Sequence, residues 1–226
     1  MAELIYIDEQ KAQAGQVLRR AVASGEFTQE QVYALEPEST LEGTIQKILE
    51  LHCKVLITDY RLSDHKPDVE FNGAELVREF RDRFADFPCF VTTSFPDQAI
   101  EETIDTNLVF PKSDFLDREP QENSELPFFK RVRKKISEYE RQVADAQSEL
   151  QALSKLAIER DLEAHEAQRL LDLDSYLESV LGAQYAIEQH IKKRALEPFD
   201  RLIGQTEVLL NKIKSELAKP SKTGGS

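Results

Sequence analysis

The sequence of 226 residues contains no tryptophan, a single methionine and no long hydrophobic run. No stretch approaches the roughly 20 apolar residues that a membrane-spanning helix requires, so we expect no membrane partner. The N-terminal apolar residues follow no basic region and meet an acid at Asp8, unlike a secretory signal. Cytoplasmic localisation is the resulting expectation.

Cysteine is also scarce, since only Cys53 and Cys89 are present. Their separation is too wide for the closely spaced ligand pairs of a zinc knuckle. Two thiols in a cytoplasmic chain are most simply two buried side chains. We therefore assign no metal or redox role to either cysteine.

Basic residues are few in the first part of the chain. Residues 1–126 contain 26 acids and 12 bases, whereas residues 127–226 contain 16 acids and 17 bases. An acidic surface repels nucleic acid, so we expect no nucleic-acid partner. One basic cluster, Lys130–Lys135, is interpreted as the solvated face of a helix.

Short apolar runs alternate with amphipathic segments over the first half of the chain. Each run is too short for a helix and is followed by apolar residues spaced three and four apart, which predicts alternating strands and helices. Such alternation is typical of a doubly wound α/β fold with a five-stranded parallel sheet. The predicted strands cover residues 4–7, 32–35, 54–59, 90–94 and 108–110.

Polar residues follow four of these strands. Asp8 and Glu9 follow the first strand, Asp59 ends the third, and Lys112 follows the fifth. Because parallel strands bring their carboxyl ends to one edge, three carboxylates would meet there and repel one another unless a divalent cation lay between them. Oxygen ligands of this kind favour Mg²⁺. A hydroxyl group from Thr93 or Ser94 and the ammonium group of Lys112 would then bind a phosphoryl group.

These residues, in this order, resemble the receiver domain of two-component response regulators over about residues 3–119. The resemblance rests on the acid pair, on Leu56-Ile-Thr-Asp59, on Asn72-Gly73 before a helix, on Thr93-Ser94 and on Lys112. It implies a flavodoxin-like receiver fold that is not an enzyme and accepts a phosphoryl group from a histidine kinase or a phosphotransfer protein.

The resemblance also implies a role for each residue. Asp59 is the expected phosphoacceptor, and Asp8, Glu9, Asp59 and the main-chain carbonyl of Arg61 are the expected Mg²⁺ ligands. Thr93 is the expected switching hydroxyl. The amide of Ser94 would approach the phosphoryl group, and Lys112 would bind it.

The second part of the chain predicts an all-α extension. After a polar linker at residues 120–126, apolar residues recur every three or four positions without proline or glycine over residues 128–181, which predicts a long helix with a heptad seam. The seam consists of Phe129, Val132, Ile136, Tyr139, Val143, Ala146, Leu150, Leu153, Ala157, Arg160, Ala164, Ala167 and Leu171.

The seam needs a partner, and two are possible. We expect a homodimer through residues 128–171, with a folded-back helical bundle as the alternative. Further helices are expected up to residue 219, which places the helical region at residues 127–219. Residues 220–226 are expected to form a flexible tail.

Two histidines of this helical part are weaker candidates for a phosphorelay. An acid follows His165, and a lysine lies three residues after His190. Exposed helical histidines without a function are far commoner than such relay sites.

Three functions remain open from the sequence. The first is a signalling receiver whose state reaches a coiled-coil output. The second is a receiver-like docking protein that no longer cycles. A magnesium-dependent phosphatase comes third, because Arg61 stands where such enzymes usually carry a second aspartate.

Overall fold

The structure is a computed structural model, and it describes residues 2–102, 105–116, 128–181, 190–193, 196, 206–212 and 214. Short 3₁₀ turns cover Gln29–Gln31 and Thr106–Leu108. The strands are β1 (Leu4–Ile7), β2 (Val32–Leu35), β3 (Val55–Asp59), β4 (Cys89–Thr93) and β5 (Val109–Pro111). The helices are α1 (Lys11–Ala23), α2 (Leu41–Leu51), α3 (Gly73–Arg83), α4 (Pro96–Glu102), α5 (Ser113–Leu116), α6 (Phe128–Glu159) and α7 (Ala164–Leu181).

The five strands form one parallel sheet in the order β2-β1-β3-β4-β5. Every residue of β1, β3 and β4 is buried, as expected for central parallel strands that are covered on both faces. The order is that of the flavodoxin-like doubly wound fold. The predicted fold class is therefore confirmed.

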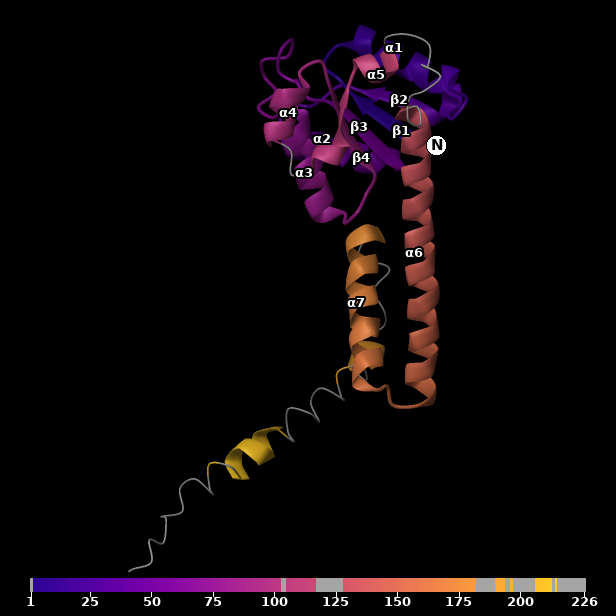
Figure 1. The fold of residues 1–226 in the computed structure, drawn as a ribbon, viewed down its shortest axis with the longest axis vertical. Coiled ribbons are helices and arrows are strands. Elements are labelled where there is room, and N and C mark those ends of the chain that lie inside the picture. The colour runs from indigo at the N-terminus through magenta and orange to yellow at the C-terminus, as the bar shows by residue number, and fades with distance from the viewer. Residues whose placement is uncertain are drawn as a thin grey trace, which may run out of the picture. The chain divides into compact units, whose positions relative to one another are not determined.

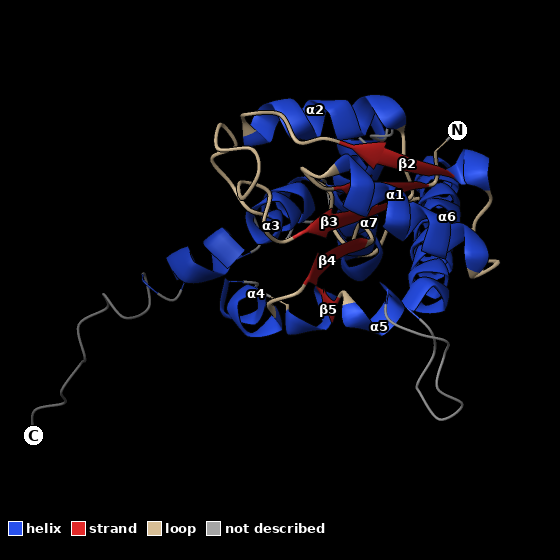
Figure 2. Cartoon of the chain, turned by 90° about the horizontal axis from the view of Figure 1, so that it is seen from above, coloured by secondary structure: helices blue, strands red, loops and turns tan. Residues whose placement is uncertain are grey.

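Helices cover both faces of the sheet (Figures 1 and 2), and each face carries one cluster of hydrophobic side chains. On one face, Ile5 and Ile7 of β1 pack with side chains of α2, α3 and α4, which include Ile45, Phe80 and Ala99. The opposite face is covered by α1, α5 and the beginning of α6. The alternation of side chains along each strand divides the core in this way.

The beginning of α6 is a structural part of the sheet domain. Its buried residues Phe128, Phe129, Val132 and Ile136 share a cluster with strand residues. The Phe128 ring stacks on Phe115, with their centroids 4.6 Å apart. Large aromatic rings in edge and stacked contacts bury much apolar area, so this helix completes the second layer.

Polar contacts hold the same part of α6. A guanidinium nitrogen of Arg133, Nη1, lies 2.7 Å from Oε2 of Glu3, and Nζ of Lys54 lies 2.7 Å from Oε1 of Glu140. The first compact unit accordingly spans Met1–Val143, and the second spans Ala144–Ser226. The first unit thus extends past residue 119, where the sequence suggests that the receiver ends.

The uninterrupted helix expected over residues 128–181 is corrected by the structure. Helix α6 ends at Glu159 and α7 begins at Ala164, although no glycine or proline lies between them. The guanidinium group of Arg160 donates to both carboxylate oxygens of Glu166, at 2.9 and 2.7 Å. The Glu166 carboxylate also accepts the N–H of Glu163 at 2.9 Å. The prediction assumed that only glycine or proline would end the helix. Here side chains that cap the turn end it instead.

Within the second unit, the end of α6 and α7 form a helical hairpin (Figure 1). Arg169 on α7 donates two hydrogen bonds to the Glu149 carboxylate on α6, at 2.8 and 2.6 Å. The hairpin buries apolar side chains of both helices. These are Ala146, Leu150 and Ala157 on α6, Leu162 in the turn, and Ala167, Leu170, Leu173, Leu177 and Val180 on α7.

The predicted heptad seam is thus largely buried within one chain. Phe129, Val132 and Ile136 are covered in the first unit, and Ala146 and Leu150 in the second. The folded-back alternative describes this arrangement. A homodimer through residues 128–171 loses most of the apolar surface on which that expectation rested.

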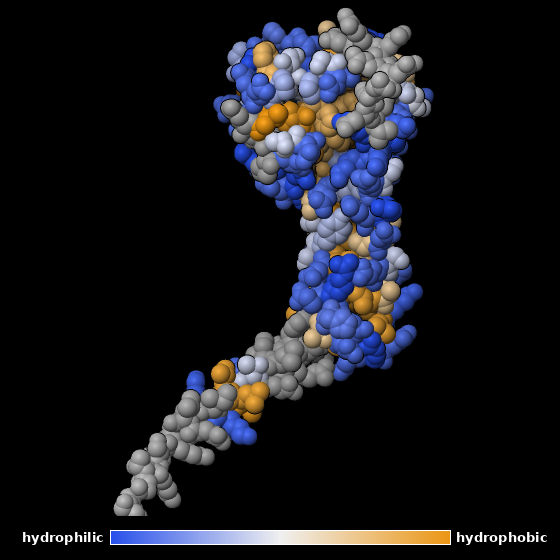
Figure 3. Space-filling model, in the orientation of Figure 1, coloured by the Kyte–Doolittle hydropathy of each residue, from blue (hydrophilic) through white to orange (hydrophobic). Residues whose placement is uncertain are grey.

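Parts of the remaining helical region are described. Ile191 is buried, while Val208, Leu209 and Leu210 are between 49% and 69% exposed. Figure 3 shows hydrophobic side chains among hydrophilic ones in this C-terminal part. The predicted linker at 120–126 and tail at 220–226 lie outside the described residues. Across the part of the chain that is described, no helix is long and apolar enough to cross a bilayer.

The role of α6 in the first unit can be tested by truncation. We expect residues 1–143 to unfold cooperatively and residues 1–126 to be largely unfolded at 25 °C. Four large buried side chains would be lost, each worth about 1.5–3 kcal/mol, and the total approaches the stability of an average domain. Thermal unfolding followed by circular dichroism distinguishes the fragments. Equal stability of the two would contradict the assignment of α6 to the first unit.

Candidate functional site

The alternating direction of side chains along the strands places four polar side chains on the same face of the sheet, at the edge where the strands end. Asp8 lies two residues after Tyr6, Asp59 two after Ile57, Thr92 two after Phe90, and Lys112 two after Phe110. Tyr6, Ile57 and Phe90 belong to the core layer under α1 and α6, and Phe110 packs against that layer. Since residues i and i+2 point to the same side, the polar side chains gather above that layer.

The three predicted acids do lie together. Carboxylate oxygens of Asp8, Glu9 and Asp59 are all within 4.8 Å of one another. Asp8 accepts the N–H of Gln10 at 2.8 Å, and Asp59 accepts the N–H of Tyr60 at 2.8 Å. Oε2 of Glu9 is buried and has no hydrogen-bond partner among the described residues. Hard oxygen atoms that converge with one of them unpaired fit a divalent cation such as Mg²⁺.

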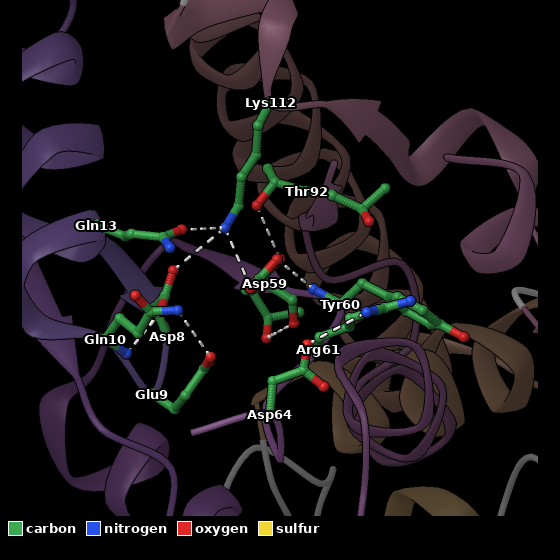
Figure 4. A network of polar contacts seen from close by, with 12 residues as sticks. Asp8, Glu9, Gln10, Gln13, Asp59, Tyr60, Arg61, Asp64, Thr92 and Lys112 are labelled. Carbon is green, nitrogen blue, oxygen red and sulfur yellow. Dashed lines mark hydrogen bonds and ion pairs between the residues drawn. The ribbon is translucent and has the colours of Figure 1, made fainter. Parts of the chain in front are cut away.

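Lys112 lies among these acids (Figure 4). Its ammonium nitrogen is 3.1 Å from Oδ2 of Asp59, 3.4 Å from Oδ2 of Asp8 and 2.9 Å from Oε1 of Gln13. The side chain of Lys112 is only 8% exposed, so these three acceptors stabilise its positive charge in place of water. An ammonium group has three hydrogens, and the site provides one acceptor for each.

Burial dominates the electrostatics of the cluster. Loss of hydration raises the pKa of Asp59 to about 7, although Lys112 opposes the shift, while the charges of Asp8 and Glu9 add to it. Burial also raises the pKa of Glu9. The single positive charge of Lys112 therefore does not balance the negative charges of the acid cluster.

The other predicted residues lie beside the cluster. Thr93 is buried, and its hydroxyl oxygen accepts the N–H of Phe95 at 2.9 Å, which leaves its hydrogen available for donation. Ser94 is exposed. The Arg61 guanidinium lies over the Phe95 ring, 3.8 Å from the centroid, and its Nη2 donates to Gln98 at 2.8 Å.

The start of α3 approaches Asp59 closely. The N–H of Gly73 donates to the carbonyl of Tyr60 at 2.8 Å, and Asn72 and Glu75 form a capping box. A Cβ atom on Gly73 would lie 2.1 Å from the main-chain oxygen of Asp59. Only glycine fits this position without displacing the strand end that carries Asp59.

The two predicted relay histidines belong to the second unit. His165, on α7, is largely exposed, and its Nδ1 lies 3.4 Å from Oε2 of Glu163. The neighbouring Glu166 carboxylate is engaged by Arg160, which lowers the pKa of Glu166 to about 2. His190 is exposed. The acid beside His165 thus caps a helix.

Sequence reasoning missed three residues of the site. Gln13 on α1 bonds Lys112, and Tyr6 and Thr92 form a buried hydroxyl pair 3.0 Å apart beneath the acids. The alternation rule could have found Tyr6, since it lies two residues before Asp8. Gln13 carries no comparable signal, because its role depends on how α1 packs.

Substitution of Gly73 tests the close approach. We expect Gly73→Ala to destabilise the protein by about 1–3 kcal/mol, because overpacking forces the backbone to move. Gly15→Ala is the control, since the added carbon would be 3.5 Å from an Arg19 side-chain nitrogen and should stabilise α1 by about 0.5–1 kcal/mol. Urea unfolding measures both changes. A Gly73→Ala protein as stable as wild type would contradict the predicted clash.

Titration of Asp59 gives a second test, in the presence of a chelator. Because the pKa of the Asp59 carboxyl group is about 7 in the folded state and its ordinary value is 3.8, the folded state retains a proton that the unfolded state loses. Stability from this group therefore falls as pH rises from about 4 to 7, by at most about 4 kcal/mol. We expect Asp59→Asn to remove that fall, so that it gains stability over wild type between pH 5 and pH 8. Urea unfolding measures the stability of both proteins at each pH. If the stabilities of Asp59→Asn and wild type changed in parallel with pH, the Asp59 carboxyl group would not retain a proton in the folded state.

Similarity between this chain and known proteins is found among solved structures. No family model matches the sequence, and no curated protein matches it. Among solved structures, the chain is similar to the DNA complex of the two-component response regulator RcsB, with 15% identity over 87% of this chain and 98% of that one, at a TM-score of 0.38. RcsB from Salmonella enterica serovar Typhimurium, bound to promoter P1flhDC in the presence of the phosphomimetic BeF₃⁻, has 13% identity over 88% of this chain and 98% of that one, at a TM-score of 0.34.

These structures correct one expectation from the sequence. We expected no nucleic-acid partner from the acidic charge, but similar solved structures include response regulators bound to DNA. The physical reason is that net charge averages over a whole surface, whereas binding needs only a local basic one. The net charge of −13 is therefore no basis for that exclusion.

The fold itself rests on the strand order and the two helical layers. A parallel β2-β1-β3-β4-β5 sheet carries the polar edge, and helices follow it in the chain. The chain has the fold of a receiver domain with a helical extension.

Proposed function

We propose that the first unit is a phosphoacceptor receiver of a two-component system, modified on Asp59. The observation that carries the proposal is that Asp59 lies beside both the acid pair and Lys112, with Oε2 of Glu9 unpaired among the described residues. A carboxylate in this setting has both a nucleophilic oxygen and neighbours able to bind a phosphoryl group. The proposed donor is a histidine kinase or a phosphotransfer protein.

The proposed transfer needs one cation. Asp8, Glu9, Asp59 and the carbonyl of Arg61 would hold Mg²⁺, which when bound supplies positive charge to the acids and to the oxygens of the phosphoryl group. A bound cation would suit the electrostatics of the site, because the negative charge of the carboxylates exceeds the single positive charge of Lys112.

Three residues of the site would then each contribute to the transfer. A carboxylate oxygen of Asp59 attacks phosphorus, a new oxygen–phosphorus bond forms, and the bond to the donor's leaving group breaks with its electron pair. Lys112, already 3.1 Å from Asp59, donates to an oxygen of the phosphoryl group. Thr93 donates its free hydroxyl hydrogen to another.

The output is proposed to involve the α6–α7 hairpin. Helix α6 contributes residues to both compact units, so it links the receiver core to the hairpin through one continuous element. A change in the layer under α1 and α6 would reach the hairpin along that helix. A protein partner that binds the hairpin would then respond to phosphorylation.

Phosphorylation is tested by intact mass. With Mg²⁺ and a small phosphoryl donor such as acetyl phosphate, we expect the wild-type chain to gain one phosphoryl group and Asp59→Asn to gain none. Asp145→Asn, a change at an exposed aspartate of α6, should be modified like wild type. Excess chelator should abolish the reaction. An unmodified wild-type mass under saturating donor would favour the non-cycling docking protein instead.

A further inference from the structure

The carboxylates of Asp8 and Asp59 divide their oxygens in the same way. Oδ1 of Asp8 accepts the N–H of Gln10 at 2.8 Å, and Oδ1 of Asp59 accepts the N–H of Tyr60 at 2.8 Å. Oδ2 of each acid faces the ammonium nitrogen of Lys112, at 3.4 Å for Asp8 and 3.1 Å for Asp59. Lys112 is therefore paired with two of the three acids that form the proposed cation site.

Gln13 supplies the remaining acceptor for Lys112. Its Oε1 atom lies 2.9 Å from Nζ of Lys112, and Figure 4 shows the Gln13 side chain reaching the ammonium group from α1. An ammonium group only donates, so the amide must present its oxygen. Among the described residues, Gln13 is the one acceptor for the Lys112 side chain that carries no charge and lies outside the acid cluster.

Binding of a divalent cation would change these contacts unequally. The carboxylates of Asp8 and Asp59 would then be shared between the metal and Lys112, and the two positive charges repel each other. The pairing of Lys112 with the acids weakens, whereas its contact with the neutral amide does not. Because Lys112 is only 8% exposed, water cannot easily replace a lost acceptor. Gln13 therefore contributes more to the site with a cation than to the site without one.

We propose that Gln13 is a positioning residue that retains Lys112 beside the phosphoacceptor when a divalent cation occupies the acid cluster. The inference rests on the proposed function, because it takes the acid cluster as a cation site. It gives Gln13 an influence on cation affinity although Gln13 is not a ligand of the cation. It also keeps the ammonium group next to Asp59, where it would donate to an oxygen of the phosphoryl group.

The affinity for Mg²⁺ tests this role. Gln13→Met removes the amide oxygen with little change in side-chain length or helix propensity, so Mg²⁺ should bind about fivefold more weakly. Gln16→Met is the matched control, since Gln16 is an exposed residue of the same helix, and it should bind like wild type. Isothermal titration of the full chain at pH 8 measures the affinities, because this pH lies above the pKa of Asp59, which is about 7.

A double-mutant cycle separates positioning of Lys112 from a purely structural role. Lys112→Met removes the ammonium group, so adding Gln13→Met to it should not change the Mg²⁺ affinity further. A general distortion of α1 would instead weaken binding by the same factor in both backgrounds. Circular dichroism and thermal unfolding verify that each variant is folded. If Lys112→Met is unfolded, the comparison of Gln13→Met with Gln16→Met still tests the role.

The outcomes separate the two proposals. Measurable binding by wild type with unchanged or tighter binding by a folded Gln13→Met protein overturns the positioning role and leaves the cation site intact. An equal loss of affinity with and without Lys112 overturns the positioning role as well. Absence of Mg²⁺ binding in wild type overturns the cation site and the positioning role together.

Discussion

The structure depends on the burial of one ammonium group among carboxylates at the carboxyl edge of a parallel sheet. Lys112 reaches Asp59, Asp8 and Gln13 within 3.4 Å, and these partners lie at the end of β3, directly after β1 and on α1. Burying so many charges is favourable only if geometry and pairing are close to optimal. The strands, the tight approach of Gly73 and the aromatic layer beneath all serve to hold that geometry.

Much of this could be predicted from the sequence because its signals are local. Short apolar runs that end in Asp8, Asp59 and Lys112 predict strands, and topology brings parallel strand ends to one edge. The parallel sheet and the meeting of the three acids therefore follow from patterns of a few residues. The chemistry at the edge remains a proposal because no cation or phosphoryl group is fixed by such patterns.

What the sequence did not predict depends on contacts between distant segments. The role of Gln13 follows from the packing of α1, and the Tyr6–Thr92 pair joins residues 86 positions apart. The end of α6 was missed for a different reason. Helix termini are usually read from glycine and proline, whereas here Arg160 and Glu166 cap a turn in which every residue has an ordinary helical propensity.

That turn has a consequence for the second unit. Since no residue between Glu159 and Ala164 forbids helical dihedral angles, the backbone itself does not require the reversal, and side chains alone maintain it. The exposed Arg160–Glu166 pair contributes little because solvent screens its charges, so the apolar side chains that the two helices and the turn bury carry most of the energy of the hairpin. The reversal is therefore a tertiary property, and its persistence depends on how well the burial of these side chains competes with uninterrupted helix propagation.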